Sequence, residues 1–215
     1  METNITNLIQ SKDYQRLGKA LSDNPLLANE GIGLDSEENT KAHPLHRLGD
    51  AVFAKKISED EAIAFAKIFL DFGANINGVD LAENEDSPLT AAVSFYAEKL
   101  ALFYIEQGAD IHQRGCHGGT ALHWAAWVGN ATVLNKLIDL GAQINQLCDR
   151  FKSTPLLWAV HGIRFGGENN QHQQAECVKI LLAHRADKTI PNFEGYAPFE
   201  FLDDKHKELK QLLMI

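Results

Sequence analysis

Gly118-Gly119-Thr120-Ala121-Leu122-His123-Trp124-Ala125-Ala126, followed by Gly141-Ala142-Gln143-Ile144-Asn145, decides the fold, because both phrases return along the chain. The first returns in altered form as His43-Pro44-Leu45-His46, Ser87-Pro88-Leu89-Thr90, Thr154-Pro155-Leu156-Leu157 and Tyr196-Ala197-Pro198-Phe199. The second returns as Gly73-Ala74-Asn75-Ile76-Asn77, Gly108-Ala109-Asp110-Ile111-His112 and Arg185-Ala186-Asp187. Repetition of one short unit predicts a stack of similar structural modules.

Each repeat of these two phrases has the sequence signals of two antiparallel helices. Pro at the start of the first phrase suits the first helical turn, where its missing N–H costs nothing. Gly129 and Asn130 should end the first helix, and Gly141 fits a left-handed cap at the end of the second. Apolar residues at helical spacing supply the buried faces; in this unit they are Leu122, Ala125, Ala126, Val133, Leu134, Leu137, Ile138 and Leu140.

Two of the repeats are about ten residues longer than the others. The anchors Pro44, Pro88, Ala121, Pro155 and Pro198 are separated by 44, 33, 34 and 43 residues. In the first long unit, Ser58-Glu59-Asp60-Glu61 is typical of a capping box, so we expect the first helix to run to Ile57 and the second to start at once. In the other, residues 162–170 are rich in Gly and Asn, which predicts a loop.

This pattern resembles the ankyrin repeat, whose motif reads roughly Gly-x-Thr-Pro-Leu-His-x-Ala-Ala, then Gly, an apolar helix and Gly-Ala-Asp-x-Asn. Residues 115–147 match it nearly throughout, and the resemblance covers about residues 40–200. It implies an all-α solenoid of stacked antiparallel helix pairs joined by hairpin-like turns. We expect a single domain with these parts: N-terminal capping helices at 1–39, repeats at 40–80, 81–114, 115–148 and 149–191, and a C-terminal capping repeat at 192–215.

Composition narrows the function classes. A formal net charge of −9 argues against nucleic acid as the partner, because its binders carry a basic face. Three cysteines form no paired framework, and we expect them to be free in a reducing compartment. The N-terminus lacks a signal-peptide pattern, and no apolar run has the length of a membrane helix. We therefore expect a cytoplasmic monomer that binds neither membrane nor nucleic acid.

The resemblance also implies where a protein partner would bind, since ankyrin repeats usually meet partners with their hairpin tips and the concave face of their first helices. The two positions after the Ala-Ala pair should point into that groove; they are Asp50 and Ala51, Ser94 and Phe95, Trp127 and Val128, and His161 and Gly162. The hairpin tips should present Glu83, Asn84 and Asp86, then Cys116, His117 and Gly119, then Arg150, Phe151 and Ser153.

Aromatic residues stand out in both sets. Phe95, Trp127 and Phe151 could anchor a partner, where truncation of such a side chain costs about 2 kcal/mol or more. The alternative is that they pack on neighbouring repeats, and Trp127 is the leading candidate for an anchor. Trp124 and Trp158 occupy the equivalent apolar position of successive repeats, so we assign both to the core.

A second hypothesis is a regulatory or neutralising subunit that inhibits an enzyme or toxin through acidic hairpin tips. The residues behind it occur without an intervening Lys or Arg and could steer a basic partner, although a solvated loop explains them equally well; they are Asp71, Asp80, Glu83, Glu85 and Asp86.

Other chemistry is poorly supported. The available metal ligands lack the closely spaced pairs that zinc prefers; they are Cys116, His117, His123, Cys148, His161, His172 and Cys177. His46 and His123 occupy the His position of the motif, and the resemblance implies that they form hydrogen bonds within the hairpin region instead. No hydrolase, metalloprotease or P-loop motif is present, so we expect no enzyme, metal or cofactor. Asn77 and Asn145 match the hairpin Asn that asparaginyl hydroxylases modify in ankyrin repeats, the alternative being that each caps its own turn.

Overall fold

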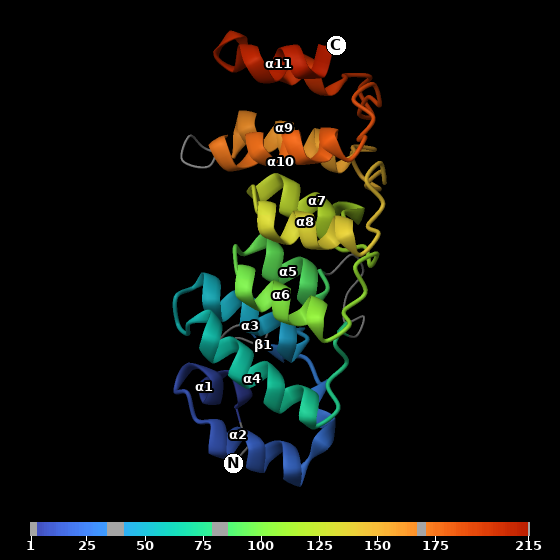
Figure 1. Cartoon of the computed structure of the whole chain (residues 1–215). Helices are drawn as coiled ribbons and strands as arrows, with labels where there is room; N and C mark the ends of the chain where they lie inside the picture. The colour runs from blue at the N-terminus through green and yellow to red at the C-terminus, as the bar shows by residue number, and fades with distance from the viewer. Residues whose placement is uncertain (1–3, 34–40, 79–85, 167–170, 215) are drawn as a thin grey trace. The chain divides into compact units, whose positions relative to one another are not determined.

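The computed structural model describes residues 4–33, 41–78, 86–166 and 171–214, with the backbone alone at 171 and 172. These residues are mostly helical, which confirms the predicted all-α class. The chain forms two compact units, residues 1–110 (unit 1) and residues 111–215 (unit 2). In each unit, consecutive helices form antiparallel pairs (Figure 1).

Unit 1 is a stack of helix pairs with a small hairpin. Its elements are α1 (Ile5–Gln10), α2 (Tyr14–Asp23), the 3-10 helix η1 (Pro25–Ala28), β1 (Ile32–Gly33), β2 (Lys41–Ala42), α3 (Pro44–Phe53), α4 (Glu59–Asp71), α5 (Pro88–Ser94) and α6 (Glu98–Glu106). The first helices α3 and α5 pack together, as do the second helices α4 and α6. The antiparallel β1–β2 pair, with Ile32 opposite Ala42, was not expected from the sequence.

The core of unit 1 joins neighbouring repeats. Tyr104 of α6 is fully buried, and its hydroxyl donates a 2.7 Å hydrogen bond to the carbonyl of Leu45 in α3. The N-terminal helices, which we expected to form a cap, bury Leu8, Ile9, Leu17 and Leu21. A terminal layer of this kind covers the apolar face that the first repeat would otherwise leave open.

The insertion of the first repeat differs from the prediction. The capping box is confirmed, since the Glu61 N–H donates to Ser58 Oγ and the Ser58 N–H donates to Glu61 Oε2. The first helix, however, ends at Phe53 and not at Ile57. Lys55 takes a left-handed conformation (φ 57°) and the Lys56 N–H donates to the carbonyl of Ala51, which closes the helix as a Schellman motif.

Unit 2 repeats the same arrangement. Its elements are η2 (Cys116–Gly118), α7 (Ala121–Val128), α8 (Ala131–Asp139), α9 (Pro155–Phe165), α10 (Gln171–Ala183), the 3-10 helices η4 (Pro198–Phe201) and η5 (Asp204–His206), and α11 (Lys207–Met214). The first helices α7 and α9 pack together, and α8 packs on α10. The predicted helix pair of the C-terminal cap is reduced to the four-residue turn η4 followed by α11.

Glycines end the helices of unit 2 as predicted. Gly129 (φ 79°) ends α7, and Gly141 (φ 90°) follows the end of α8. Arg185 replaces the glycine after α10 and takes the same left-handed conformation, with φ 66°. A residue other than glycine is strained in this left-handed conformation, because its Cβ atom lies too close to the following carbonyl oxygen.

The insertion of the fourth repeat is also not as predicted. Residues 162–165 continue α9 to Phe165, so they do not form a loop; residues 167–170 lie outside the described residues. Gly162 marks a close approach of two helices, because a Cβ atom there would overlap the carbonyl oxygen of Trp127 in α7. A glycine is therefore needed at this position for close packing of the two helices, not for a turn.

Hydrogen bonds tie the hairpin-like turns to the helices. The Thr120 N–H donates to His123 Nδ1 at 3.1 Å, so the other ring nitrogen carries the proton. That Nε2–H donates to the carbonyls of Gln146 (3.0 Å) and Ser153 (3.2 Å), which confirms the expected role of the motif His.

Among the described residues, the side chains of both hairpin asparagines bond to the neighbouring hairpin. Asn145 Oδ1 accepts from the N–H of Asp187 at 2.8 Å, and Asn77 Oδ1 accepts from the N–H of Asp110 at 2.7 Å. Each therefore joins its own hairpin to the next one within its unit.

Candidate functional site

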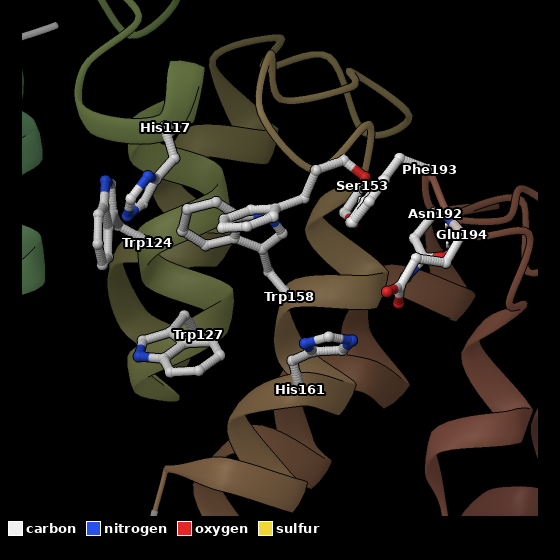
Figure 2. A pocket seen from close by; sticks show the side chains of 10 residues that line it. His117, Trp124, Trp127, Ser153, Trp158, His161, Asn192, Phe193 and Glu194 are labelled. Atoms are coloured by element: carbon white, nitrogen blue, oxygen red, sulfur yellow. Dashed lines mark hydrogen bonds between the residues drawn. The ribbon is translucent and has the colours of Figure 1, made fainter.

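A pocket of about 540 Å³ lies in unit 2, between the first helices and the hairpin turns (Figure 2). Its walls are mainly aromatic. The lining residues are His117, Trp124, Trp127, Phe151, Ser153, Trp158, His161, Asn192, Phe193 and Glu194.

Two helices supply one wall of this pocket at regular spacing. Trp124 and Trp127 lie three residues apart on α7, and Trp158 and His161 lie three residues apart on α9. Residues at this spacing share one face of a helix. The Trp158 ring is the centre of the wall, with its centroid 5.0 Å from that of Trp124 and 6.3 Å from that of Trp127, both edge to face.

Successive hairpins supply the opposite wall. The Arg150 N–H donates to the carbonyl of His117, and the Phe193 N–H donates to the carbonyl of Phe151. These bonds fix the register of the three hairpins, so that His117, Phe151 and Phe193 all reach the pocket. The His117 and Phe151 ring centroids are 5.2 Å apart, whereas Phe193 is 62% exposed. An aromatic ring this open at a pocket rim is available to a ligand.

The polar groups of the pocket differ in whether they already form hydrogen bonds. Ser153 Oγ donates to the Phe151 carbonyl, and Asn192 Oδ1 accepts from two backbone N–H groups. Within the described residues, the Glu194 carboxylate forms no hydrogen bond or ion pair, and Figure 2 shows it directed toward the ring of His161. Burial lowers the pKa of His161, and the charge of Glu194 opposes this with a smaller effect. At neutral pH, His161 is therefore uncharged.

Three nitrogens in this wall are buried without a hydrogen-bond partner among the described residues. They are Nε1 of Trp124, Nε1 of Trp158 and Nε2 of His161. Buried polar atoms are usually paired, and each unpaired one costs about 1–3 kcal/mol.

Five of the residues predicted to bind a partner meet in this pocket: His117, Trp127, Phe151, Ser153 and His161. Cys116 and Arg150 do not line it; Cys116 is half-buried and Arg150 is exposed, with its guanidinium 5.6 Å from the centre of the Phe151 ring.

The prediction for Val128 is wrong. Its side chain is 3% exposed and cannot face a groove. Val128 lies three residues after Ala125 and seven after Ala121, so it shares their buried face of α7, whereas Trp127 falls one position away on the pocket face. The parallel expectation for Gly162 fails for the same reason, because this residue is buried against α7.

The assignment of the two central tryptophans to the core is confirmed for Trp158 and wrong for Trp124. Trp158 is only 6% exposed, but Trp124 is half-buried, and both line the pocket. Asn192, Phe193 and Glu194 were not predicted at all. The available signal was the repeat register, since Phe193 precedes Pro198 at nearly the same distance at which Phe151 precedes Pro155.

The candidates of unit 1 are not gathered in one site. Asp50 lines a smaller pocket of about 310 Å³ and is paired with Arg47 at 2.6 Å. Phe95 is half-buried against Phe53, with ring centroids 5.2 Å apart. Ser94 donates to the carbonyl of Ala91.

Only part of the predicted acidic tip lies within the described residues. Asp86 is half-buried, and its carbonyl hydrogen-bonds to the ring of His46. Glu83 and Asn84 lie outside the described residues, as do Asp80 and Glu85.

Among the described residues, no three His, Cys, Asp or Glu side chains are arranged to hold a metal ion. The three cysteines Cys116, Cys148 and Cys177 are free, as expected. None of the helices in the described part of the chain combines the length and apolar character needed to cross a membrane.

Comparison with known proteins points to one family. A family model described as "Ankyrin repeats (3 copies)" matches residues 54–148 and, in an overlapping match, residues 89–192. The chain is 26% identical to mouse (Mus musculus) "Palmitoyltransferase ZDHHC13" over 168 residues, which is 78% of this chain and 24% of that protein. The human protein of the same name is 25% identical over the same shares. A zebrafish (Danio rerio) "Putative palmitoyltransferase ZDHHC13" is 31% identical over 105 residues, 49% of this chain and 15% of the relative. The chain thus spans about a quarter of the length of its mouse and human relatives.

Proposed function

Because the chain belongs to the ankyrin-repeat family, we propose that it is a non-catalytic module that binds a protein partner, part of which enters the aromatic pocket of unit 2. Ankyrin repeats generally mediate protein–protein interaction and carry no catalytic machinery of their own. The proposal does not extend to the palmitoyl transfer named for the relatives, since only about a quarter of their length is matched.

The observation that carries the proposal is the concentration of five Trp and Phe rings around one open pocket. Binding energy at protein interfaces is concentrated in a few aromatic or Arg anchors at a well-packed centre. Phe193 strengthens the argument, because a ring that is 62% exposed next to a pocket gains apolar burial when a partner covers it. The free cysteines support a reducing compartment, and we propose a cytosolic location.

Affinity capture from native lysate tests this function when the variants are matched. We expect Phe193→Ala and Trp127→Ala to lose a captured protein that the unaltered chain retains, with a loss of affinity of roughly thirtyfold for an anchor worth about 2 kcal/mol. Phe53→Ala is the control, because Phe53 is 59% exposed, belongs to unit 1 and is not among the residues that line the pocket. Circular dichroism must show that each variant is folded. If folded pocket variants capture the same proteins as Phe53→Ala, the pocket does not bind the partner.

The alternative of an inhibitor that acts through acidic hairpin tips depends mainly on Asp80, Glu83 and Glu85, which lie outside the described residues.

A further inference from the structure

The pocket of unit 2 has the composition of a site for a cation with few hydrogen-bond donors. Its walls are five aromatic rings from Trp124, Trp127, Phe151, Trp158 and Phe193. The face of an aromatic ring carries partial negative charge and attracts a cation, with Trp the strongest. Glu194 adds the only carboxylate among the lining residues. We propose that the pocket takes up the methylated ammonium group of a lysine side chain of the partner, an inference that rests on the binding function proposed above.

The number of acceptors in the pocket decides between cations. Asn192 Oδ1 already accepts two backbone N–H groups and Ser153 Oγ donates to the Phe151 carbonyl, so the Glu194 carboxylate is the only charged acceptor among the lining residues, beside the weaker hydroxyl oxygen of Ser153. An unmodified lysine brings three N–H donors and an arginine five, most of which would face aromatic carbon and lose their water without replacement. Dimethyllysine keeps one donor, which matches one carboxylate, and trimethyllysine has none. Methylation retains the charge while removing the donors that this pocket cannot satisfy.

The groups around the pocket favour a cation inside it, with Arg150 as the exception described below. His161 is neutral at pH 7, so it does not repel a cation, and Glu194 lies on its side of the pocket. Arg150 is the nearby positive group that works against binding, since its guanidinium lies over the Phe151 ring at 5.6 Å and within 3.5 Å of His117 Nδ1. It is exposed and does not line the pocket, so solvent screens its charge.

The protein contains its own reporter for this site. The chain has three tryptophans, and all three line the pocket. A change in intrinsic tryptophan fluorescence on adding a ligand therefore reports on this pocket.

The test titrates the full chain with short Gly/Ser peptides that carry one central residue. The residue is lysine, dimethyllysine, trimethyllysine, arginine, or the neutral carbon isostere of trimethyllysine, in which a tert-butyl group replaces trimethylammonium. We expect dimethyllysine and trimethyllysine to bind at least tenfold more tightly than lysine or arginine, and trimethyllysine about tenfold more tightly than its neutral isostere. Equal binding of the isostere would identify the pocket as a site for an apolar side chain and overturn the proposal. It would also fail if lysine or arginine bound as tightly as the methylated forms, or if no peptide bound.

A charge-matched pair of variants isolates the carboxylate. Glu194→Gln should weaken dimethyllysine binding at least fivefold, whereas Glu208→Gln removes the same charge from an exposed position of α11 and should leave it unchanged. Equal effects of the two variants would show that only general charge attracts the peptide and would overturn the site. These outcomes are separable from the proposed function: if Phe193→Ala abolishes partner capture while methylated peptides show no preference, the pocket binds the partner through other chemistry.

Discussion

Acidification from pH 7 to pH 4 should destabilise both units of this protein, because each holds one buried histidine in its neutral form. His43 in unit 1 is 2% exposed and His123 in unit 2 is fully buried. In each ring Nδ1 accepts a backbone N–H, from Leu45 at 3.3 Å and from Thr120 at 3.1 Å. A proton added at Nδ1 would face that N–H, so charging the ring breaks a hydrogen bond and also places a charge in the core.

The size of the effect follows from the pKa values. Burial lowers the pKa of both His43 and His123 from 6.5 to about 4. Between these limits the unfolded chain binds protons that the folded chain excludes, so the stability contributed by each neutral ring is complete above pH 6.5 and is lost as pH falls toward 4. A shift of this size corresponds to about 3 kcal/mol per histidine. That is a large fraction of the 5–15 kcal/mol that typically stabilises a folded domain.

Urea unfolding at fixed ionic strength, followed by circular dichroism at half-unit steps between pH 7 and 4.5, measures this loss. Each histidine should contribute a slope approaching 1.4 kcal/mol per pH unit in the free energy of unfolding. His123→Gln is destabilised at pH 7 but should lose one such slope, which separates the histidine from carboxylates that titrate below pH 5. A wild-type stability that is constant from pH 6.5 to 4.5, or a His123→Gln profile parallel to the wild type, would refute the reasoning.

Two further substitutions test the backbone conformations. Arg185→Gly should stabilise unit 2 by about 0.5–1 kcal/mol, because glycine adopts the φ of 66° without strain; a lower urea midpoint would contradict this. Gly118→Ala should destabilise the same unit by more than about 2 kcal/mol, since Gly118 has φ 68° and a Cβ atom would overlap the Asp149 side chain. Alanine at position 118 with an unchanged thermal midpoint would show that the hairpin adjusts freely.

Much of the fold was predictable because its signals are local. A proline at the first helical position, a glycine after the last and the capping box at Ser58 each act within a few residues, and all three were confirmed. The errors at the two insertions have causes that the local sequence does not show. Lys55 takes a left-handed conformation that its residue type does not indicate, and Gly162 exists because the backbone of α7 approaches it across the stack.

The candidate site was predictable only where one position per repeat pointed to it. His117, Phe151 and Trp127 occupy positions that the repeat motif leaves free, and all three reach the pocket. Trp124 could not be told from a core residue, because the face of α7 that meets the pocket is as apolar as the face that meets α9. The repeat register places Phe193 in the same part of its hairpin as Phe151, but the backbone hydrogen bond that joins the two hairpins is seen only in the structure.

The motif and the pocket are nevertheless physically connected. His123 belongs to the motif, yet its Nε2–H holds the carbonyl of Ser153, which lines the pocket, and its ring lies 5.3 Å from that of Trp158 at the pocket centre. The same histidine thus fixes the distance between the helix wall and the hairpin wall. Protonation of His123 would break the hydrogen bond at Nδ1 and weaken this support, so we expect the aromatic pocket to change shape in the same pH range that destabilises unit 2. If the pocket binds the partner as proposed, residues that identify the family contribute to this binding by holding its walls in place, without touching the ligand themselves.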